Sequence, residues 1–487
     1  MPTSSHEKNA DERANASFLR RALRAALQIL TVGFWREWFV RPCGGREAIR
    51  LATPIVVSTA SFALLNFADR VYLTWWDSRA MTAAFQSGCL LWATTTFAVG
   101  IASYVNAFAS QYFGAGERRR IGLNVWQGVF FGLVAGLFYV AATPLVERLF
   151  LALRSTPEAA VLARNYWFYG SLGSSALIGH EPLGAYFCAQ RDMKTVMAIG
   201  LATVGLNVVL DPLFIFVLKL GCEGAAMASA ISLWFKFFLY LWLAFRRDKT
   251  VCCGLREGMR LDLSELKKLT RFGSMSATQQ TAENLCFTFF VLLTGYFGEE
   301  YAAAAGIAFN LDCLAFMPIV GLGIATTTMV GNEIGAGRPE LAARSVRTTA
   351  ALGTFLTGVF ALAFFVAPNF FIDAYGSRAG EDFSAIREPT VFALRFVSAY
   401  MLFDAINVVL ASALRGAGDA KFIMMATFAT ASIVSVALLF GVFLFGRGLT
   451  WCWTFISLYV VSNACIFLVR LAQGGWKNRS LVAPTVK

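Results

Sequence analysis

The chain has 487 residues, of which 57% are hydrophobic and only 15% are charged. Soluble domains carry roughly 25% charged residues, so this composition excludes an ordinary soluble enzyme or binding domain. The formal net charge of +12 does not indicate binding to nucleic acid, because the basic residues cluster between apolar stretches rather than in one domain.

The first 50 residues form a predicted cytoplasmic N-terminal segment. Residues 1–17 are polar, and residues 18–40 form an amphipathic stretch that is rich in Arg and has no small-residue cleavage site. We therefore expect an interfacial helix that lies on the membrane rather than a cleaved signal peptide.

Twelve apolar stretches follow, and each is long enough to cross a bilayer, which takes about 20 residues. The sequence therefore predicts an all-α integral membrane protein with about twelve transmembrane helices. The predicted spans are 51–74, 83–112, 122–143, 163–189, 194–218, 224–245, 271–297, 302–333, 346–368, 388–414, 421–446 and 449–473.

Lys and Arg set the expected orientation of these spans. With the N-terminus inside, the inside segments hold roughly 31 of the 42 Lys and Arg residues, as the positive-inside rule requires. We therefore expect both termini to be cytoplasmic in a multi-pass protein of the cell inner membrane.

The longest inside loop divides the chain into two halves. We expect an N-terminal lobe of six helices over 51–246, a cytoplasmic linker over 247–270, a C-terminal lobe of six helices over 271–474 and a cytoplasmic tail over 475–487. Paired landmarks, about 221 and 224 residues apart, predict that the lobes are related by a pseudo-twofold axis: Gly114-Ala115-Gly116 with Gly335-Ala336-Gly337, and Ala189-Gln190-Arg191 with Ala413-Leu414-Arg415.

Acidic residues inside predicted spans are the main candidates for function. A charged side chain at membrane depth costs roughly 2.5–3.5 kcal/mol, so such residues are rare and usually functional. A carboxylate there can hold H⁺, Na⁺ or an organic cation, and competition among these cations couples their fluxes. The acidic candidates are Asp69 and Asp211 in the first half and Glu283 and Asp404 in the second, and the polar Asn207 is a further candidate beside Asp211.

Each candidate also has a structural interpretation. Asp69 could reach the membrane interface beside Arg70, and Asp211 could cap a helix that restarts at Pro212. Glu283 and Asp404 could be neutral carboxyls whose hydrogen bonds hold helices together. Asn207 and Asp211 are four residues apart, so a helix places them on one face.

Four more residues are secondary candidates: His180, Glu181, Gln279 and Asn407. His180 precedes Arg191 by eleven residues, as Asp404 precedes Arg415. The repeat therefore places His180 and Glu181 at the position in the first lobe that is equivalent to the Asp404 site. A proton role is conceivable for a His, but the favoured interpretation is a structural His. The ten Cys residues are scattered and show no zinc-binding spacing.

Several stretches together resemble the multidrug and toxic-compound extrusion (MATE) family over nearly the whole chain. They are LLNFADRVYL around Asp69, SQYFGAGERRR (110–120), LNVVLDPLFIF (206–216), GNEIGAGRPELA (331–342) and FDAINVVLASALRGAGDAK (403–421). The resemblance implies that Asp69 lies in a first-lobe cavity and that Glu283 and Asp404 bind the coupling cation. Na⁺ is the candidate metal at these two residues.

The resemblance implies a secondary active antiporter. Such a protein exports organic, mainly cationic, drugs in exchange for inward Na⁺ or H⁺ by alternating access, and we expect a monomer in the lipid bilayer with no cofactor beyond the coupling ion. The alternative is a flippase for a lipid-linked saccharide in the same superfamily, although acidic residues favour cationic cargo. An enzyme is disfavoured because the chain has two His residues, no HExxH motif and no Walker loop.

Overall fold

The computed structural model describes residues 38–76, 78–152, 156–376 and 383–482. Side chains are not described for 62–71, 74–76, 78–84, 374–376 and 383–385. The predicted interfacial helix at 18–40 thus lies almost entirely outside the described residues, as does the side chain of Asp69. The described part of the chain consists of helices joined by short turns and contains no strand.

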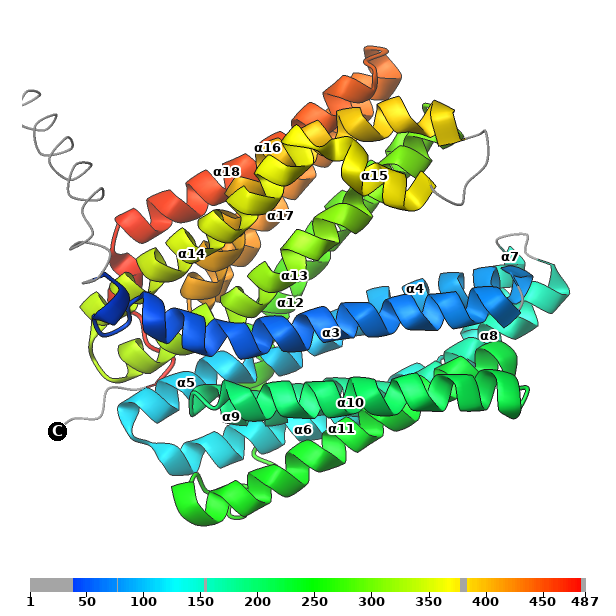
Figure 1. The fold of residues 1–487 in the computed structure, drawn as a ribbon. Coiled ribbons are helices and arrows are strands. Elements are labelled where there is room, and N and C mark those ends of the chain that lie inside the picture. The colour runs from blue at the N-terminus through cyan, green and yellow to red at the C-terminus, as the bar shows by residue number, and fades with distance from the viewer. Residues whose placement is uncertain (1–37, 77, 153–155, 377–382, 483–487) are drawn as a thin grey trace, which may run out of the picture.

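Each of the first six predicted spans corresponds to one long helical segment (Figure 1). These segments are α3 (Gly45–Trp76), α4 with α5 (Ser78–Ser103 and Val105–Ala115), α6 (Arg118–Ala141), α8 with α9 (Pro157–Leu172 and Ser174–Ala189), α10 (Met193–Pro212) with the π-helical turn η1 (Leu213–Val217), and α11 (Gly221–Val251).

The last six predicted spans are likewise confirmed as long helical segments. They are α12 (Leu263–Gly295), α13 (Glu299–Gly335), α14 (Pro339–Val366), α16 (Phe383–Gly416), α17 (Ala420–Leu439) with the π-helical turn η2 (Phe440–Leu444), and α18 (Leu449–Ala472).

Nine of these segments within the described ranges are long and apolar enough to cross a membrane by length and composition alone. The other three are α3, the pair α8 and α9, which is divided at Gly173, and α12, which carries Gln279, Gln280 and Glu283. Large apolar side chains on the outer faces are exposed, including Phe138, Leu292 and Ile433. Such faces suit contact with lipid rather than water.

The helices form two lobes whose internal contacts repeat. In the N-terminal lobe (α3–α11) α6 packs on α9 and α10 packs on α3, while in the C-terminal lobe (α12–α18) α14 packs on α16 and α17 packs on α12. Between the lobes, the contact of α3 with α13 matches that of α12 with α4. This exchange of equivalent contacts confirms the predicted pseudo-twofold relation.

The repeat extends to features that the sequence analysis did not predict. A short helix follows the third span of each lobe, α7 (Thr143–Ala152) in the first and α15 (Pro368–Gly376) in the second. The π-helical turns η1 and η2 end the fifth span of each lobe. These elements lie at similar offsets in the two halves, so they add structural support for the duplication.

The lobes meet at one end of the molecule and diverge toward α7, α8 and α15 at the other (Figure 1). The paired Gly-Ala-Gly motifs explain the close approach at the first end, which we call the closed end. A Cβ atom on Gly114 would lie 2.0 Å from the Asn332 carbonyl oxygen, and one on Gly335 would lie 2.1 Å from that of Gln111. Only glycine at these positions lets α5 and α13 cross so closely.

The predicted linker between the lobes is folded against the N-terminal lobe. Trp126 Nε1 of α6 donates to the Leu255 carbonyl at 2.8 Å, and Gln127 Nε2 donates to the Arg260 carbonyl at 2.9 Å. Asp262 caps α12 by accepting from Ser264 and Glu265, and these hydrogen bonds, with that from the Ser264 side chain foremost, lower the pKa of the Asp262 carboxyl. The linker therefore fixes the start of the second lobe against the first.

Candidate functional site

Acidic side chains from three helices lie close together inside the C-terminal lobe. Glu283 on α12 and Asp404 on α16 were predicted from the sequence, and Asp312 on α13 was missed. The charge of Asp404 acts on both Glu283 and Asp312, which places the three carboxyls in one region. The general rule that intramembrane acids are functional also applies to Asp312, since it lies inside the predicted span 302–333.

Amide and phenol groups surround these acids. Gln279 Nε2 donates to Glu283 Oε2 at 2.9 Å, and Asn407 Nδ2 donates to Asp404 Oδ1 at 3.5 Å. Both amides were secondary candidates, and each lies beside the acid on its own helix. The Tyr400 hydroxyl donates to Asp312 Oδ2 at 3.1 Å.

Arg415 enters the C-terminal site from the closed end. Its Nη2 donates to Gln279 Oε1 at 3.0 Å, and its charge acts on Glu283. Arg415, Gln279 and Glu283 thus form a chain of contacts from the closed end to the acids. Because an ionised carboxylate in this region is costly without a cation nearby, the site suits reversible binding of one.

The residues of the C-terminal site offer oxygen ligands rather than a transition-metal centre. Over the described residues, no group of three or more His, Cys, Asp or Glu side chains is arranged to hold a metal ion. Carboxylate, amide and phenol oxygens are hard ligands, which suit hard cations. They match the chemistry of Na⁺ or of a proton.

The N-terminal lobe contains a second polar group on α10. Asn207 and Asp211 are both fully buried, and Asn207 Nδ2 donates to Asp211 Oδ1 at 3.3 Å. They share one helix face, as their spacing predicts. Asp69 lies on α3, which packs on α10, but its side chain is outside the described residues. The alternative role of Asp211 as a helix cap is wrong, because α10 continues through Pro212 into η1.

His180 lies between α9 and α11. Its Nε2 is 3.1 Å from Lys236 Nζ, its Nδ1 is 3.6 Å from Glu181 Oε1, and Tyr240 packs on its ring. Only 4% of His180 is exposed. These contacts support the structural interpretation of His180 and Glu181, which tie the two helices together.

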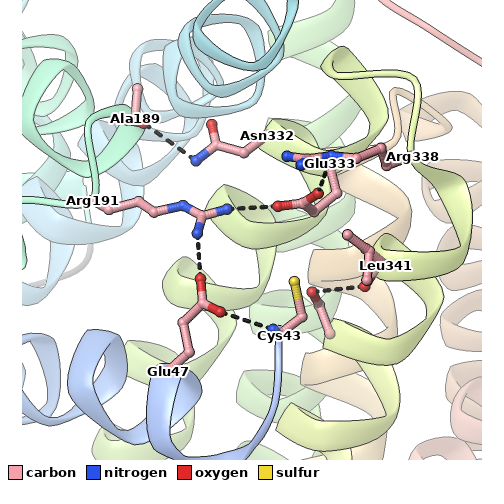
Figure 2. A network of polar contacts seen from close by, with 9 residues as sticks. Cys43, Glu47, Ala189, Arg191, Asn332, Glu333, Arg338 and Leu341 are labelled. Atoms are coloured by element: carbon pink, nitrogen blue, oxygen red, sulfur yellow. Dashed lines mark hydrogen bonds and ion pairs between the residues drawn. The ribbon is translucent and has the colours of Figure 1, made fainter. Parts of the chain in front are cut away.

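The closed end is held by a polar network that the sequence analysis did not predict (Figure 2). Arg191, in the turn between α9 and α10, contacts Glu47 of its own lobe and donates through Nη2 to Glu333 Oε1 of the other lobe at 2.8 Å. Arg338 Nε lies 2.9 Å from Glu333 Oε2. These residues line a cavity of about 430 Å³ between the lobes, together with Cys43 and Asn332.

Two further hydrogen bonds cross between the lobes from donors in equivalent positions of the repeat. Gln111 Nε2 donates to the Gly416 carbonyl at 2.7 Å, and Asn332 Nδ2 donates to the Ala189 carbonyl at 3.3 Å. Gln111 and Asn332 are 221 residues apart, like the two Gly-Ala-Gly motifs that follow them. The conformation is thus closed at this end by reciprocal contacts from both lobes.

A helical bundle of two repeated lobes, with buried acids in each lobe and a polar closure at one end, is the architecture of a multi-pass membrane transporter. The family model MatE matches the chain twice, over residues 54–213 and 276–440. The chain therefore belongs to the MatE family, with one family repeat in each lobe.

Known relatives agree with this assignment. A protein described as "Probable multidrug resistance protein NorM" from Thermotoga maritima is 24% identical over 449 residues, which cover 90% of this chain and 94% of the relative. Two solved transporters share the fold. A MOP superfamily transporter from Pyrococcus furiosus has a TM-score of 0.82 at 19% identity, with 91% of this chain and 98% of that chain covered. An outward-facing multidrug resistance MATE family transporter has a TM-score of 0.81 at 19% identity with the same coverage.

Proposed function

We propose that the protein is a multidrug antiporter of the bacterial inner membrane that exports organic, mainly cationic, compounds in exchange for inward Na⁺ or H⁺. It acts as a monomer and needs no cofactor other than the coupling ion. The names of the bacterial NorM relatives support multidrug export, and the buried acids support cationic cargo.

The acid group of the C-terminal lobe is the observation that carries this proposal. Glu283, Asp312 and Asp404 project from three different helices into one region, and Arg415 is the basic side chain whose charge acts on Glu283. A cation bound there balances the negative charge of the carboxylates that Arg415 does not neutralise. An organic cation, Na⁺ and H⁺ then compete for the same groups, and this competition couples export to ion entry.

The arrangement of the lobes supports alternating access. The predicted orientation places the closed end at the cytoplasm, so we take the conformation described to be one that is closed toward the cytoplasm. Transport requires the lobes to rock about the pseudo-twofold axis until the closed end separates. Binding of the coupling cation from the outside favours release of the organic compound there, and the cation-loaded protein then turns inward and releases the cation.

The test is efflux of ethidium from proteoliposomes under an imposed Na⁺ gradient and then a pH gradient. We expect one gradient to drive export by the parent protein, and Asp404→Asn and Glu283→Gln to slow export at least about tenfold, since each removes a charge that the cation needs. The matched control is Asp373→Asn, because Asp373 is an exposed acid on α15. Export that no gradient drives, or that both site variants leave unchanged, contradicts the proposal.

A further inference from the structure

The last described residues, 474–482, cross from the C-terminal lobe to the N-terminal lobe at the closed end. The chain turns at Gly474, which has a φ of 73°, and forms the short 3₁₀ helix η3 (Gly475–Asn478). The Trp476 side chain is 2% exposed, packs in an apolar cluster of the C-terminal lobe and donates from Nε1 to the Leu471 carbonyl at 2.9 Å. This ring fixes the beginning of the segment.

An ion pair anchors the middle of the segment to the same lobe. Arg479 Nη1 donates to Asp419 Oδ1 at 2.6 Å, and Arg470 Nε donates to Asp419 Oδ2 at 2.9 Å. Asp419 is 1% exposed, so the pair is shielded from solvent on the acidic side. The segment is therefore anchored on the C-terminal lobe where it reaches the boundary between the lobes.

The end of the segment contacts the N-terminal lobe. The Leu481 amide donates to Gln111 Oε1 at 2.7 Å, and the Ser480 hydroxyl donates to the same oxygen at 3.2 Å. Leu481 and Val482 pack with the apolar core of the N-terminal lobe, and Val482 is 5% exposed. Gln111 is fully buried and holds Gly416 with its other amide atom. The segment thus completes a contact that joins the two lobes.

The pseudo-twofold relation explains why a segment is needed at this position. On one side of the closed end, Glu333 follows Asn332 and pairs with Arg191. On the other side, Tyr112 follows Gln111, and Arg415, the counterpart of Arg191, donates to Gln279 of its own lobe. Among the described residues, the ion pair across the lobes is therefore made on one side only, and residues 480–482 lie on the other side.

We propose that residues 474–482 act as a strap that holds the lobes together at the closed end and slows its opening. This regulation rests on the proposed alternating access, in which the closed end must separate in each cycle. Separation breaks the contacts of Leu481 and Ser480 with Gln111, or pulls Arg479 away from Asp419. The strap sets the balance between the two states without touching the acid sites.

Cys43 provides a native reporter of opening. It is 2% exposed in an apolar cluster formed by α3 together with Met329 and Val409 of the other lobe, and burial raises the pKa of its thiol. Its alkylation is therefore slow while the lobes are together. The other nine Cys residues are replaced by Ala, and alkylation of purified protein by N-ethylmaleimide is followed in detergent without substrate or gradient.

The experiment compares two truncated chains. A chain that ends at Arg479 keeps the anchor but loses the contacts with Gln111, and we expect Cys43 to react at least about fivefold faster, since hydrogen bonds and apolar burial between the lobes are lost. A chain that ends at Val482 keeps the strap and should react within about twofold of the full chain.

Equal alkylation rates in the full chain and the chain ending at Arg479 overturn the strap. If that truncated chain does not fold, Leu481→Asp in the full chain makes the same test, because a charge there disrupts the apolar contact with the N-terminal lobe. Since the assay involves no transport, its outcome is independent of whether the protein exports cations.

Discussion

Arg191 and Glu333 form an ion pair that joins the two lobes at the closed end, with 2.8 Å between Arg191 Nη2 and Glu333 Oε1. The two residues are 142 positions apart, and Glu333 is 3% exposed. Glu333 also pairs with Arg338 of its own lobe, while Arg191 also pairs with Glu47. The pair is thus part of a network with matched charges, so removal of one member leaves another buried or half-buried charge with one partner fewer.

We expect Arg191→Gln to weaken the closed end because Glu333 then keeps only Arg338. Loss of one member of a buried pair is strongly destabilising, so the melting temperature of the purified protein should fall by about 2–4 °C. Glu333→Gln should have a similar effect. The double variant should lose less than the sum of the two single changes, since the pair is removed only once.

Arg164→Gln is the matched control for the Arg191 and Glu333 variants. Arg164 pairs with Glu147 at 3.0 Å within one lobe, and both side chains are about one-third exposed. Exposed pairs contribute little, so the melting temperature should change by less than about 1 °C. Strictly additive losses in the Arg191 and Glu333 variants mean that the pair does not hold the lobes together.

The Gly-Ala-Gly motifs predict a second effect at the closed end. In Gly114→Ala or Gly335→Ala, the added methyl group collides with the backbone of the other lobe, which cannot yield as a flexible side chain does. Such overpacking costs about 1–3 kcal/mol. We expect the lobes to separate at this end and Cys43 to be alkylated several-fold faster in the single-Cys protein.

Gly306→Ala is the control on the same helix as Gly335. Nothing lies within 4 Å of the Cβ that this change adds, and the residue is helical, so alanine should be tolerated or slightly stabilising. Slow Cys43 alkylation in all three glycine variants contradicts the assigned role of Gly114 and Gly335.

The spans and the repeat could be predicted from the sequence, whereas the closure between the lobes could not. Apolar length and the distribution of Lys and Arg are local properties, so they indicate helices without knowledge of how these pack. Arg191 and Arg415 occupy equivalent positions in the repeat, yet one contacts the opposite lobe and the other contacts Gln279 of its own. That difference depends on which helices meet in space.

The acid sites were predicted in part. Charge or polarity inside an apolar span is costly, and this rule predicted Glu283, Asp404, Asn207 and Asp211. In the structure Asn207 donates a hydrogen bond to Asp211, and the charge of Asp404 acts on Glu283. Asp312 satisfies the same rule but is not among the residues predicted from the sequence. Its pairing with Tyr400, 88 residues away, depends on the packing of α13 against α16.

Asp312 interacts with Asp404 and with the Tyr400 hydroxyl, so its carboxyl should contribute to the C-terminal site. Asp312→Asn removes one of the three interacting carboxyls, and we expect ethidium efflux from proteoliposomes to slow at least about tenfold. Tyr400→Phe removes only the hydroxyl that donates to Asp312, so efflux should slow by about two- to tenfold, the effect of one hydrogen bond. In Asp312→Asn, the further change Tyr400→Phe should cost less than it does alone, since the carboxylate that accepts the bond is gone.

Asp373→Asn should leave efflux unchanged, because this exposed acid pairs only with Arg387 among the described contacts. If Asp312→Asn transports at the parent rate while Asp404→Asn does not, Asp312 is a structural residue that orients Tyr400, and the cation site is limited to Glu283 and Asp404.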